Sequence, residues 1–172
     1  VDDNGNILGT PASNEIFYTS SDGNIIEPYD PNAFGGILVS NTYSNGVGVI
    51  VFDRAVTTIG EYAFHSKLYL TAISLPNSVS KIDGNAFYSC SGLTNITIPN
   101  SVTAIGDQAF YHCRSLTNFT IPNNITMIGN SVFRRCSSLT NITIPNSVTA
   151  IGSSAFSECR NLTNITIPNS VT

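Results

Sequence analysis

A 23-residue repeat organises most of the chain. Leucines recur at this interval, at Leu70, Leu93, Leu116, Leu139 and Leu162. The stretch that begins at Leu93 reads LTNITIPNSVTAIG, and the same letters follow from Leu139. Self-similarity at a short fixed period is the signature of repeat architectures, in which stacked units bury a continuous core that no single unit could bury alone. The sequence therefore predicts a solenoid.

The first half of each unit predicts a short strand. In the segment LTNITIP, Ile96 and Ile98 alternate with Thr97, which is the pattern of a half-buried strand, and β-branched side chains favour that conformation. Pro99 ends the strand because proline has no N–H to donate to a ladder. Strands of stacked units would form one parallel sheet, which we expect on the concave face.

The second half of each unit predicts a short helical turn on the other side. The segment DQAFYHC, residues 107–113, places Ala109, Phe110 and Cys113 at a spacing that fits one turn of helix facing the core. Asp107 lies where it can cap that turn. The expected fold is a right-handed α/β solenoid of leucine-rich-repeat type with 23-residue units.

Three regions follow from the composition and the repeat. Residues 1–13 are polar and glycine-rich and are expected to form a flexible leader. Residues 14–46 contain short apolar runs separated by Asp-Gly, Pro and Gly-Gly, and are expected to form a small N-terminal β cap. Residues 47–172 hold the solenoid, with units that start near residues 47, 70, 93, 116, 139 and 162.

Both ends of the repeat array depart from the consensus. The first unit is a degenerate copy, whose Ile50 and Phe52 would align with Ile73 and Leu75 of the next unit. The last unit stops after its strand, residues 162–167, so apolar side chains and an unpaired strand edge would face water there. Two copies are therefore expected to pair through their C-terminal ends, unless the natural protein continues beyond this sequence.

Charge and hydropathy argue against two classes of partner. The chain has seven Lys and Arg residues scattered along it and a net charge of −4, so the basic stripe of a nucleic-acid-binding protein is not expected. Its apolar runs are far shorter than the roughly 20 residues that a membrane-spanning helix needs. We expect neither nucleic-acid binding nor membrane insertion.

The residues that could carry chemistry are few. The four cysteines, Cys90, Cys113, Cys136 and Cys159, occupy the same position of successive units. One cysteine per unit lacks the clustered spacing of a metal site, and a column of identical side chains suits the dihedral of a disulfide poorly. Buried free thiols are the favoured interpretation, with disulfides or metal binding as alternatives.

Two further candidates are weak. His112 lies beside Cys113, but its position varies between units, which indicates solvent exposure rather than a catalytic pair. Residues 2–6, DDNGN, begin like a calcium loop but lack its required glycine and closing glutamate. The sequence predicts no catalytic residue, no metal site and no cofactor, and hence no enzyme.

The outward-facing positions of the predicted sheet form uncharged ladders of threonine and asparagine. These ladders are a candidate hydrogen-bonding surface for a glycan or a protein strand, or they bond to themselves and serve only the sheet. The near-identity of the units favours the second interpretation, because a specific site normally breaks symmetry. The candidate binding residues are Thr94, Asn95, Thr97, Thr117, Asn118, Thr120, Thr140, Asn141 and Thr143.

Breaks in the repeat mark other candidate positions. Asp53, Arg54, Glu61, Tyr62 and Tyr69 gather in the irregular first unit, and Tyr62 is added to the candidate binding residues. Later turns carry the unmatched residues Tyr111, Arg114, Arg134 and Arg135.

The consensus L-x-x-I-x-I-P-x-S-V-x-x-I-G-x-x-A-F-x-x-C resembles the BspA-like class of bacterial leucine-rich repeats, also called the Treponema pallidum type. Residues 15–45 resemble the leader that precedes such repeats in surface proteins of gut Bacteroidales. The resemblance implies a secreted or cell-surface protein from which a signal peptide has been removed. It further implies a non-catalytic adhesion or protein-interaction module, whose partner is a host or bacterial surface protein or a glycan. The alternative is a structural spacer in a bacterial surface protein.

Overall fold

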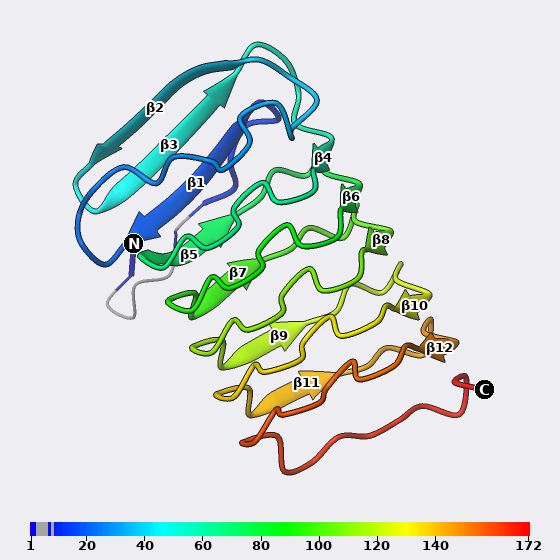
Figure 1. Cartoon of the computed structure of the whole chain (residues 1–172). Helices are drawn as coiled ribbons and strands as arrows, with labels where there is room; N and C mark the ends of the chain where they lie inside the picture. Colours follow the sequence, from blue (N-terminus) through cyan, green and yellow to red (C-terminus); the bar gives the residue numbers. More distant parts are fainter. Residues whose placement is uncertain (3–6, 8) are drawn as a thin grey trace.

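The structure is a computed structural model that describes residues 1–2, 7 and 9–172, and it shows stacked coils of a β-solenoid (Figure 1). Most of the segment 2–6 with its calcium-loop resemblance, and part of the predicted leader, lie outside the described residues. The strands of the described residues are β1 Glu15–Ser20, β2 Leu38–Ser44, β3 Val47–Phe52, β4 Thr58–Ile59, β5 Leu70–Ser74, β6 Lys81–Ile82, β7 Asn95–Thr97, β8 Ala104–Ile105, β9 Asn118–Thr120, β10 Met127–Ile128, β11 Asn141–Thr143 and β12 Ala150–Ile151.

Each coil contributes one strand to a parallel sheet, as the repeat predicts. Strands β5, β7, β9 and β11 lie side by side on one side of the solenoid (Figure 1). β5 pairs with β7 and β9 pairs with β11, both in parallel, so that Ile73 lies opposite Ile96 and Phe119 opposite Ile142. Residues 23 apart therefore become neighbours, and the buried Ile96 alternates with the outward Asn95 and Thr97.

A second set of short strands stacks on another side of the coils (Figure 1). β4, β6 and β8 form one parallel ladder, and β10 pairs with β12 in another. Ile59, Ile82 and Ile105 point inward from the first ladder and are buried. These strands come from the repeated segment around the Val-x-x-Ile-Gly sequence, whose apolar side chains the repeat places toward the core.

The predicted helical turns are wrong, because the described residues contain no helix. In the segment 107–113, Gln108 and His112 adopt left-handed backbone conformations with φ of 59° and 64°. A right-handed helix cannot include such residues. The spacing of Ala109, Phe110 and Cys113 fits a compact succession of turns as well as it fits one turn of helix.

The turns instead bind each coil to the next through the backbone. Phe87 and Ser89 donate their N–H groups to the carbonyl oxygens of Ala109 and Tyr111 in the following coil, both at 2.8 Å. In a helix these donors would bond within their own segment. The fold is thus a β-solenoid rather than an α/β solenoid, and the turn side is a third line of hydrogen bonds between coils.

The N-terminal segment extends the sheet instead of forming a separate cap. β1 lies between β3 and β5 and is antiparallel to both, with Ile16 opposite Ile50 and Tyr18 opposite Ile73. β3, assigned above to the first repeat unit, pairs with β1 and β2, so the predicted alignment of Ile50 with Ile73 is wrong. From β4 onward the predicted register holds, because Ile59 pairs with Ile82.

The core contains a column of stacked phenylalanine rings. Phe64, Phe87, Phe110, Phe133 and Phe156 follow one another with ring centroids 5.2–5.8 Å apart and ring planes within 5–7° of parallel. Phe119, which replaces the usual isoleucine of the strand, packs edge-on against two of these rings. The first four rings of the column are fully buried, so each coil contributes its largest apolar side chain to one continuous core.

The cysteines form a second buried column and are free of disulfides, which confirms the favoured interpretation. Each thiol donates a hydrogen bond to a phenylalanine carbonyl of the preceding coil, for example Cys90 to Phe64 at 2.9 Å and Cys113 to Phe87 at 3.2 Å. Burial raises the pKa of the Cys90 thiol to about 12. The thiols therefore tie adjacent coils together and remain protonated at neutral pH.

The last residues differ from the prediction. Residues 162–167, all of them described, form no strand, although the repeat predicts one there. Their side chains Ile165 and Ile167 are 38% and 48% exposed. Hydrogen bonding to the preceding coil resumes where the Ser170 hydroxyl donates to the Val148 carbonyl at 2.7 Å and Thr172 donates its N–H to the Thr149 carbonyl at 3.1 Å. The pairing of two copies through this end stays a prediction.

Removal of one core ring should cost much of the stability of the solenoid. Phe110→Ala leaves a cavity between Phe87 and Phe133, and we expect it to lower the free energy of unfolding by roughly 3–5 kcal/mol. Urea denaturation followed by circular dichroism measures this change. The exposed substitution Thr120→Ala should change it by less than about 0.5 kcal/mol. A loss well below about 1 kcal/mol for Phe110→Ala would contradict the described core.

The thiols should be inaccessible until the protein unfolds. With all four cysteines buried and hydrogen-bonded, a thiol reagent should leave the native protein essentially unmodified at pH 8, because thiolates are the reactive form. In denaturant without reductant, all four thiols should react. Fewer than four reactive thiols under those conditions would mean that disulfides exist in solution.

Candidate functional site

The threonine and asparagine ladders predicted above lie on the outer surface of β7, β9 and β11. We call this surface the Thr/Asn face. Many of its polar groups bond within the solenoid: Thr94 and Thr140 donate to the carbonyl oxygens of Thr71 and Thr117, at 2.9 and 3.1 Å. Asn141 donates to the Asn118 side chain at 3.4 Å. A role of this face in binding stays a prediction.

Tyr62 is separated from the Thr/Asn face. It belongs to the turn after β4, and its ring meets His65 edge-on at 5.5 Å. His65 stacks on Tyr88 at 5.2 Å, and Tyr88 stacks on Tyr111 at 4.7 Å. These rings form an external aromatic column along the turn side, so Tyr62 and the Thr/Asn face are two separate surfaces.

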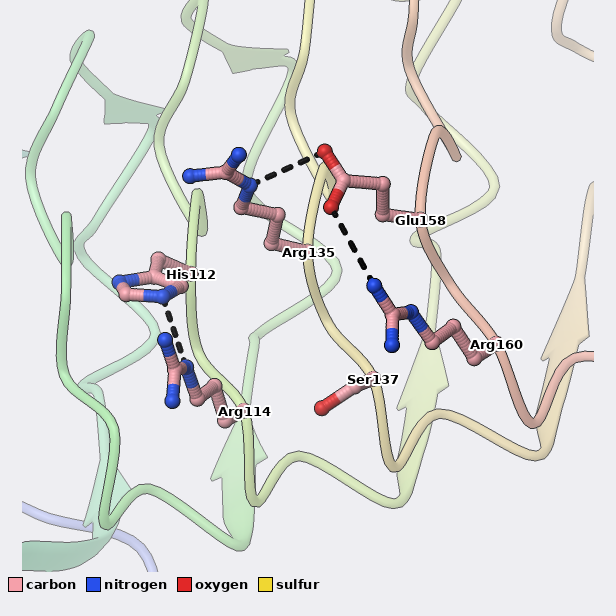
Figure 2. A pocket seen from close by; sticks show the side chains of 6 residues that line it. All are labelled: His112, Arg114, Arg135, Ser137, Glu158 and Arg160. Atoms are coloured by element: carbon pink, nitrogen blue, oxygen red, sulfur yellow. Dashed lines mark hydrogen bonds and ion pairs between the residues drawn. The ribbon is translucent and has the colours of Figure 1, made fainter.

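At its far end the aromatic column meets a group of arginines. The guanidinium groups of Arg134 and Arg135 lie 6.0 and 5.9 Å from the centre of the Tyr111 ring. Arg114 and Arg160 lie close by, and Glu158 stands among the positive charges (Figure 2). We call these four arginines with Glu158 the arginine cluster. It gathers four of the seven lysines and arginines of the chain.

The repeat explains how residues far apart in the sequence meet in the cluster. Arg114 and Arg160 occupy the same position of their units, just before the strand segment, and Ser137 holds this position in the coil between them. Arg135 and Glu158 are likewise equivalent to His112, and all three have left-handed backbones with φ of 61–65°. One backbone geometry thus presents different side chains at fixed intervals.

These side chains surround a surface hollow of about 380 Å³. Figure 2 shows its six lining residues: Arg114 and Arg160 project from opposite sides, Ser137 lies between them, Arg135 and Glu158 stand above, and His112 lies next to Arg114. A second hollow, of about 500 Å³, lies alongside and shares His112 and Arg114 with the first. The two hollows adjoin at His112 and Arg114, and we call them together the trough.

Glu158 forms ion pairs within the arginine cluster, but most guanidinium N–H donors of the cluster stay available to a ligand. Arg135 donates Nε to the carboxylate at 3.0 Å, and Arg134 and Arg160 approach it at 3.6 and 3.9 Å. The hydrogen bond from Arg135 is the largest cause that lowers the pKa of the Glu158 carboxyl. Each guanidinium carries five N–H donors, so one carboxylate cannot accept hydrogen bonds from all the donors of three arginines. The cluster can therefore bind additional anionic groups.

His112 positions Arg114. The Nε of Arg114 donates to the imidazole Nε2 at 2.7 Å, and the other ring nitrogen lies 3.3 Å from the Ser89 hydroxyl. Desolvation lowers the pKa of His112, and the charges of Arg114 and Arg135 lower it further, against the opposing effect of Glu158. The neutral imidazole can accept the arginine hydrogen bond at physiological pH, which a protonated ring could not.

The cluster was missed as a site at the sequence level. Arg114, Arg134 and Arg135 stand out there only as interruptions of the repeat. The signal that could have found the cluster is the recurrence of arginine at equivalent positions, at Arg114 and Arg160, with Arg135 in the coil between them. Equivalent positions in a solenoid are neighbours in space.

The described residues show little that points to other chemistry. Within this part of the chain no three histidine, cysteine or acidic side chains gather closely enough to hold a metal ion. A helix of the length and hydropathy needed to cross a membrane is also absent from it.

Comparison with known families decides the identity of the repeat. Residues 57–172 match the BspA type leucine-rich repeat region in six copies. The chain belongs to this family. The resemblance noted in the consensus is thereby confirmed for more than half of the chain.

Two solved structures of leucine-rich repeat proteins resemble this chain in sequence and in fold. A leucine rich cell surface protein from Faecalibacterium prausnitzii is 38% identical with a TM-score of 0.63, over 66% of this chain and 30% of that one. The leucine rich repeat protein of T. pallidum is 37% identical with a TM-score of 0.62, over 64% of this chain and 51% of that one. This chain thus spans about a third to a half of their lengths. The comparison with curated proteins found no match.

The histidine of the arginine cluster should titrate at unusually low pH. We expect the NMR-measured pKa of His112 to lie below the ordinary value of about 6.5, because burial and two arginines disfavour its protonated form. Arg114→Gln should move it back toward that value. A pKa of His112 at or above about 6.5 would contradict the described environment.

The same shift sets the direction of a pH effect on stability. A histidine whose folded-state pKa is lowered binds protons more readily in the unfolded state, so it destabilises the fold as pH falls through its unfolded value of about 6.5. The loss levels off below the folded-state pKa of His112. Arg114→Gln should reduce this loss relative to the wild type.

Proposed function

We propose that the chain is a binding module of a bacterial cell-surface protein, which attaches to a surface protein or glycan of a host or of another bacterium without catalysing a reaction. The observation that carries the proposal is the arginine cluster, an exposed group of charges in an otherwise nearly uncharged repeat. The similarity to a leucine rich cell surface protein supports the cellular location.

The cluster is difficult to explain as a contribution to stability. Three of the four arginines share one carboxylate, and like charges held this close repel one another. The Nε atom of Arg134 is buried without a hydrogen-bond partner, although most buried polar groups in proteins have one. Groups that lower stability are commonly retained where function requires them.

A structural spacer is the second candidate. The internal bonds of the Thr/Asn face favour it, because ladders that satisfy one another stabilise the sheet without a partner. A spacer, however, needs no surface that departs from the repeat. The two functions therefore differ in whether substitution of the irregular surface changes anything besides stability.

A binding screen with matched variants tests the proposal. Immobilised host matrix proteins, bacterial envelope fractions and glycans are probed with the wild-type chain, and at least one should bind. The double variant Arg114→Gln with Arg160→Gln should weaken that binding by about tenfold or more, since charge-assisted hydrogen bonds are lost. Arg54→Gln, which removes an arginine outside the cluster, is the matched control and should bind like the wild type.

A second variant set separates the other surfaces. Lysine at positions 97, 120 and 143, combined with Tyr62→Ala, alters the Thr/Asn face and the first-unit surface together. If this set abolishes binding and the arginine variants do not, the partner uses the surfaces predicted from the sequence. If the folded wild-type chain binds no member of the panel, the spacer is the better account.

A further inference from the structure

Building on the proposed function, we infer that the arginine cluster and its trough bind an acidic glycan that carries one sulfate or carboxylate group per disaccharide and runs along the solenoid axis. The inference concerns the chemical class of the partner. It rests on the spacing of the cationic side chains, on the groups between them and on the charge around them.

The spacing of the cationic side chains comes from the coils. Arg114, Ser137 and Arg160 occupy equivalent positions in three successive coils, and Figure 2 shows the serine between the two arginines. Neighbouring strands lie about 4.8 Å apart, so side chains two coils apart are separated by about 10 Å at their backbones. That distance is close to the length of two β-linked sugar rings in an extended chain. Anionic groups on alternate sugars would therefore meet Arg114 and Arg160 in turn.

An acidic peptide fits this spacing less well. In an extended strand, side chains on one face recur every two residues, about 7 Å apart. Acidic side chains at that interval would fall out of register with arginines two coils apart. A peptide would also need its backbone groups paired along its length, whereas the trough offers side-chain hydroxyl and guanidinium groups.

The residues between the arginines suit sugar hydroxyl groups. Ser137 lies in the first hollow, and Ser89, Ser91 and Ser115 line the second, which continues the trough toward the N-terminal coils. Each serine hydroxyl can both donate and accept a hydrogen bond, as sugar hydroxyls do. The trough thus alternates charged and neutral polar groups, the same alternation that such a glycan presents.

The arginines have donors available for sulfate or carboxylate. The Arg160 side chain is 78% exposed, and its contact with Glu158 is a long 3.9 Å. Arg114 uses Nε for His112, so both of its terminal nitrogens can donate to a ligand. The planar guanidinium fork matches the geometry of such oxyanions, to which it forms paired hydrogen bonds.

The charge distribution disfavours a nucleic acid. Four arginines and Glu158 give the cluster a net charge of +3 within a chain of −4, so the remaining residues carry −7. A long phosphate polymer would extend beyond the cluster over negatively charged surface. A glycan of moderate charge density gains the local attraction with less repulsion elsewhere.

The test measures binding of defined glycan chains by isothermal titration calorimetry. Hyaluronan oligosaccharides carry one carboxylate per disaccharide, monosulfated keratan sulfate oligosaccharides carry one sulfate and no carboxylate, and chitin oligosaccharides of equal length are uncharged. We expect one or both acidic glycans to bind, the uncharged one not to bind, and affinity to fall with added salt. Binding to hyaluronan assigns the carboxylate, and binding to keratan sulfate assigns the sulfate.

Variants locate the site. Arg114→Gln and Arg160→Gln should each weaken glycan binding by about tenfold, and Arg54→Gln should leave it unchanged. Ser137→Arg should shift preference toward more densely sulfated chains such as heparin, because it places a cation on every coil. Unchanged thermal unfolding temperatures of the variants exclude a loss of fold as the cause.

Four results would overturn the inference: no binding of either acidic glycan, equal binding of the uncharged glycan, tighter binding of a polyglutamate peptide, or full binding by the Arg114 and Arg160 variants. Its failure is distinguishable from failure of the proposed function. A chain that binds a protein in the broader screen but no acidic glycan remains a binding module with a different partner. A folded chain that binds nothing in either experiment contradicts both the inference and the proposed function.

Discussion

Backbone hydrogen bonds between equivalent residues of successive coils are the constraint on which the rest of this molecule depends. They run along the parallel sheet, along the ladder of β4, β6 and β8, and along the turns, where Phe87 donates to Ala109 of the next coil. Because all three lines impose the same repeat distance, side chains at equivalent positions must stack. The parallel phenylalanine rings and the thiol-to-carbonyl bonds are consequences of that distance.

The periodicity of the sequence predicts which side chains face inward, but it does not predict the conformation of the backbone that carries them. Ile96, Phe110 and Cys113 are buried as the pattern predicts, because burial depends on spacing alone. The spacing wrongly predicts helical turns because it suits both conformations, and the left-handed Gln108 and His112 are not glycines. The place of β1 between β3 and β5 depends on antiparallel contacts across many residues, for which no local pattern exists.

The candidate surfaces likewise include one that the sequence predicts and one that it does not. The Thr/Asn face could be predicted because it belongs to the repeat, and its internal hydrogen bonds show that such regularity also serves the sheet. The arginine cluster belongs to the departures from the repeat. Arg114 and Arg160 are 46 positions apart and become neighbours of one hollow only when the coils stack. Their orientation further depends on His112 and Glu158, whose contacts no linear pattern contains.

A solenoid of this kind separates the requirements of folding from those of recognition. Inward positions must keep their apolar side chains, because the apolar side chains of each coil pack against those of the next coil. Outward positions such as the one shared by Arg114, Ser137 and Arg160 can change without disturbing the backbone, whose geometry is the same in every coil. The coil distance then sets the spacing of any ligand groups that bind along the axis. Substitution at the outward positions changes only the charge and the hydrogen bonding of the side chains that meet those groups. Glu158 fits this view, because a single carboxylate paired with three guanidinium groups limits their repulsion while leaving donors for an anion.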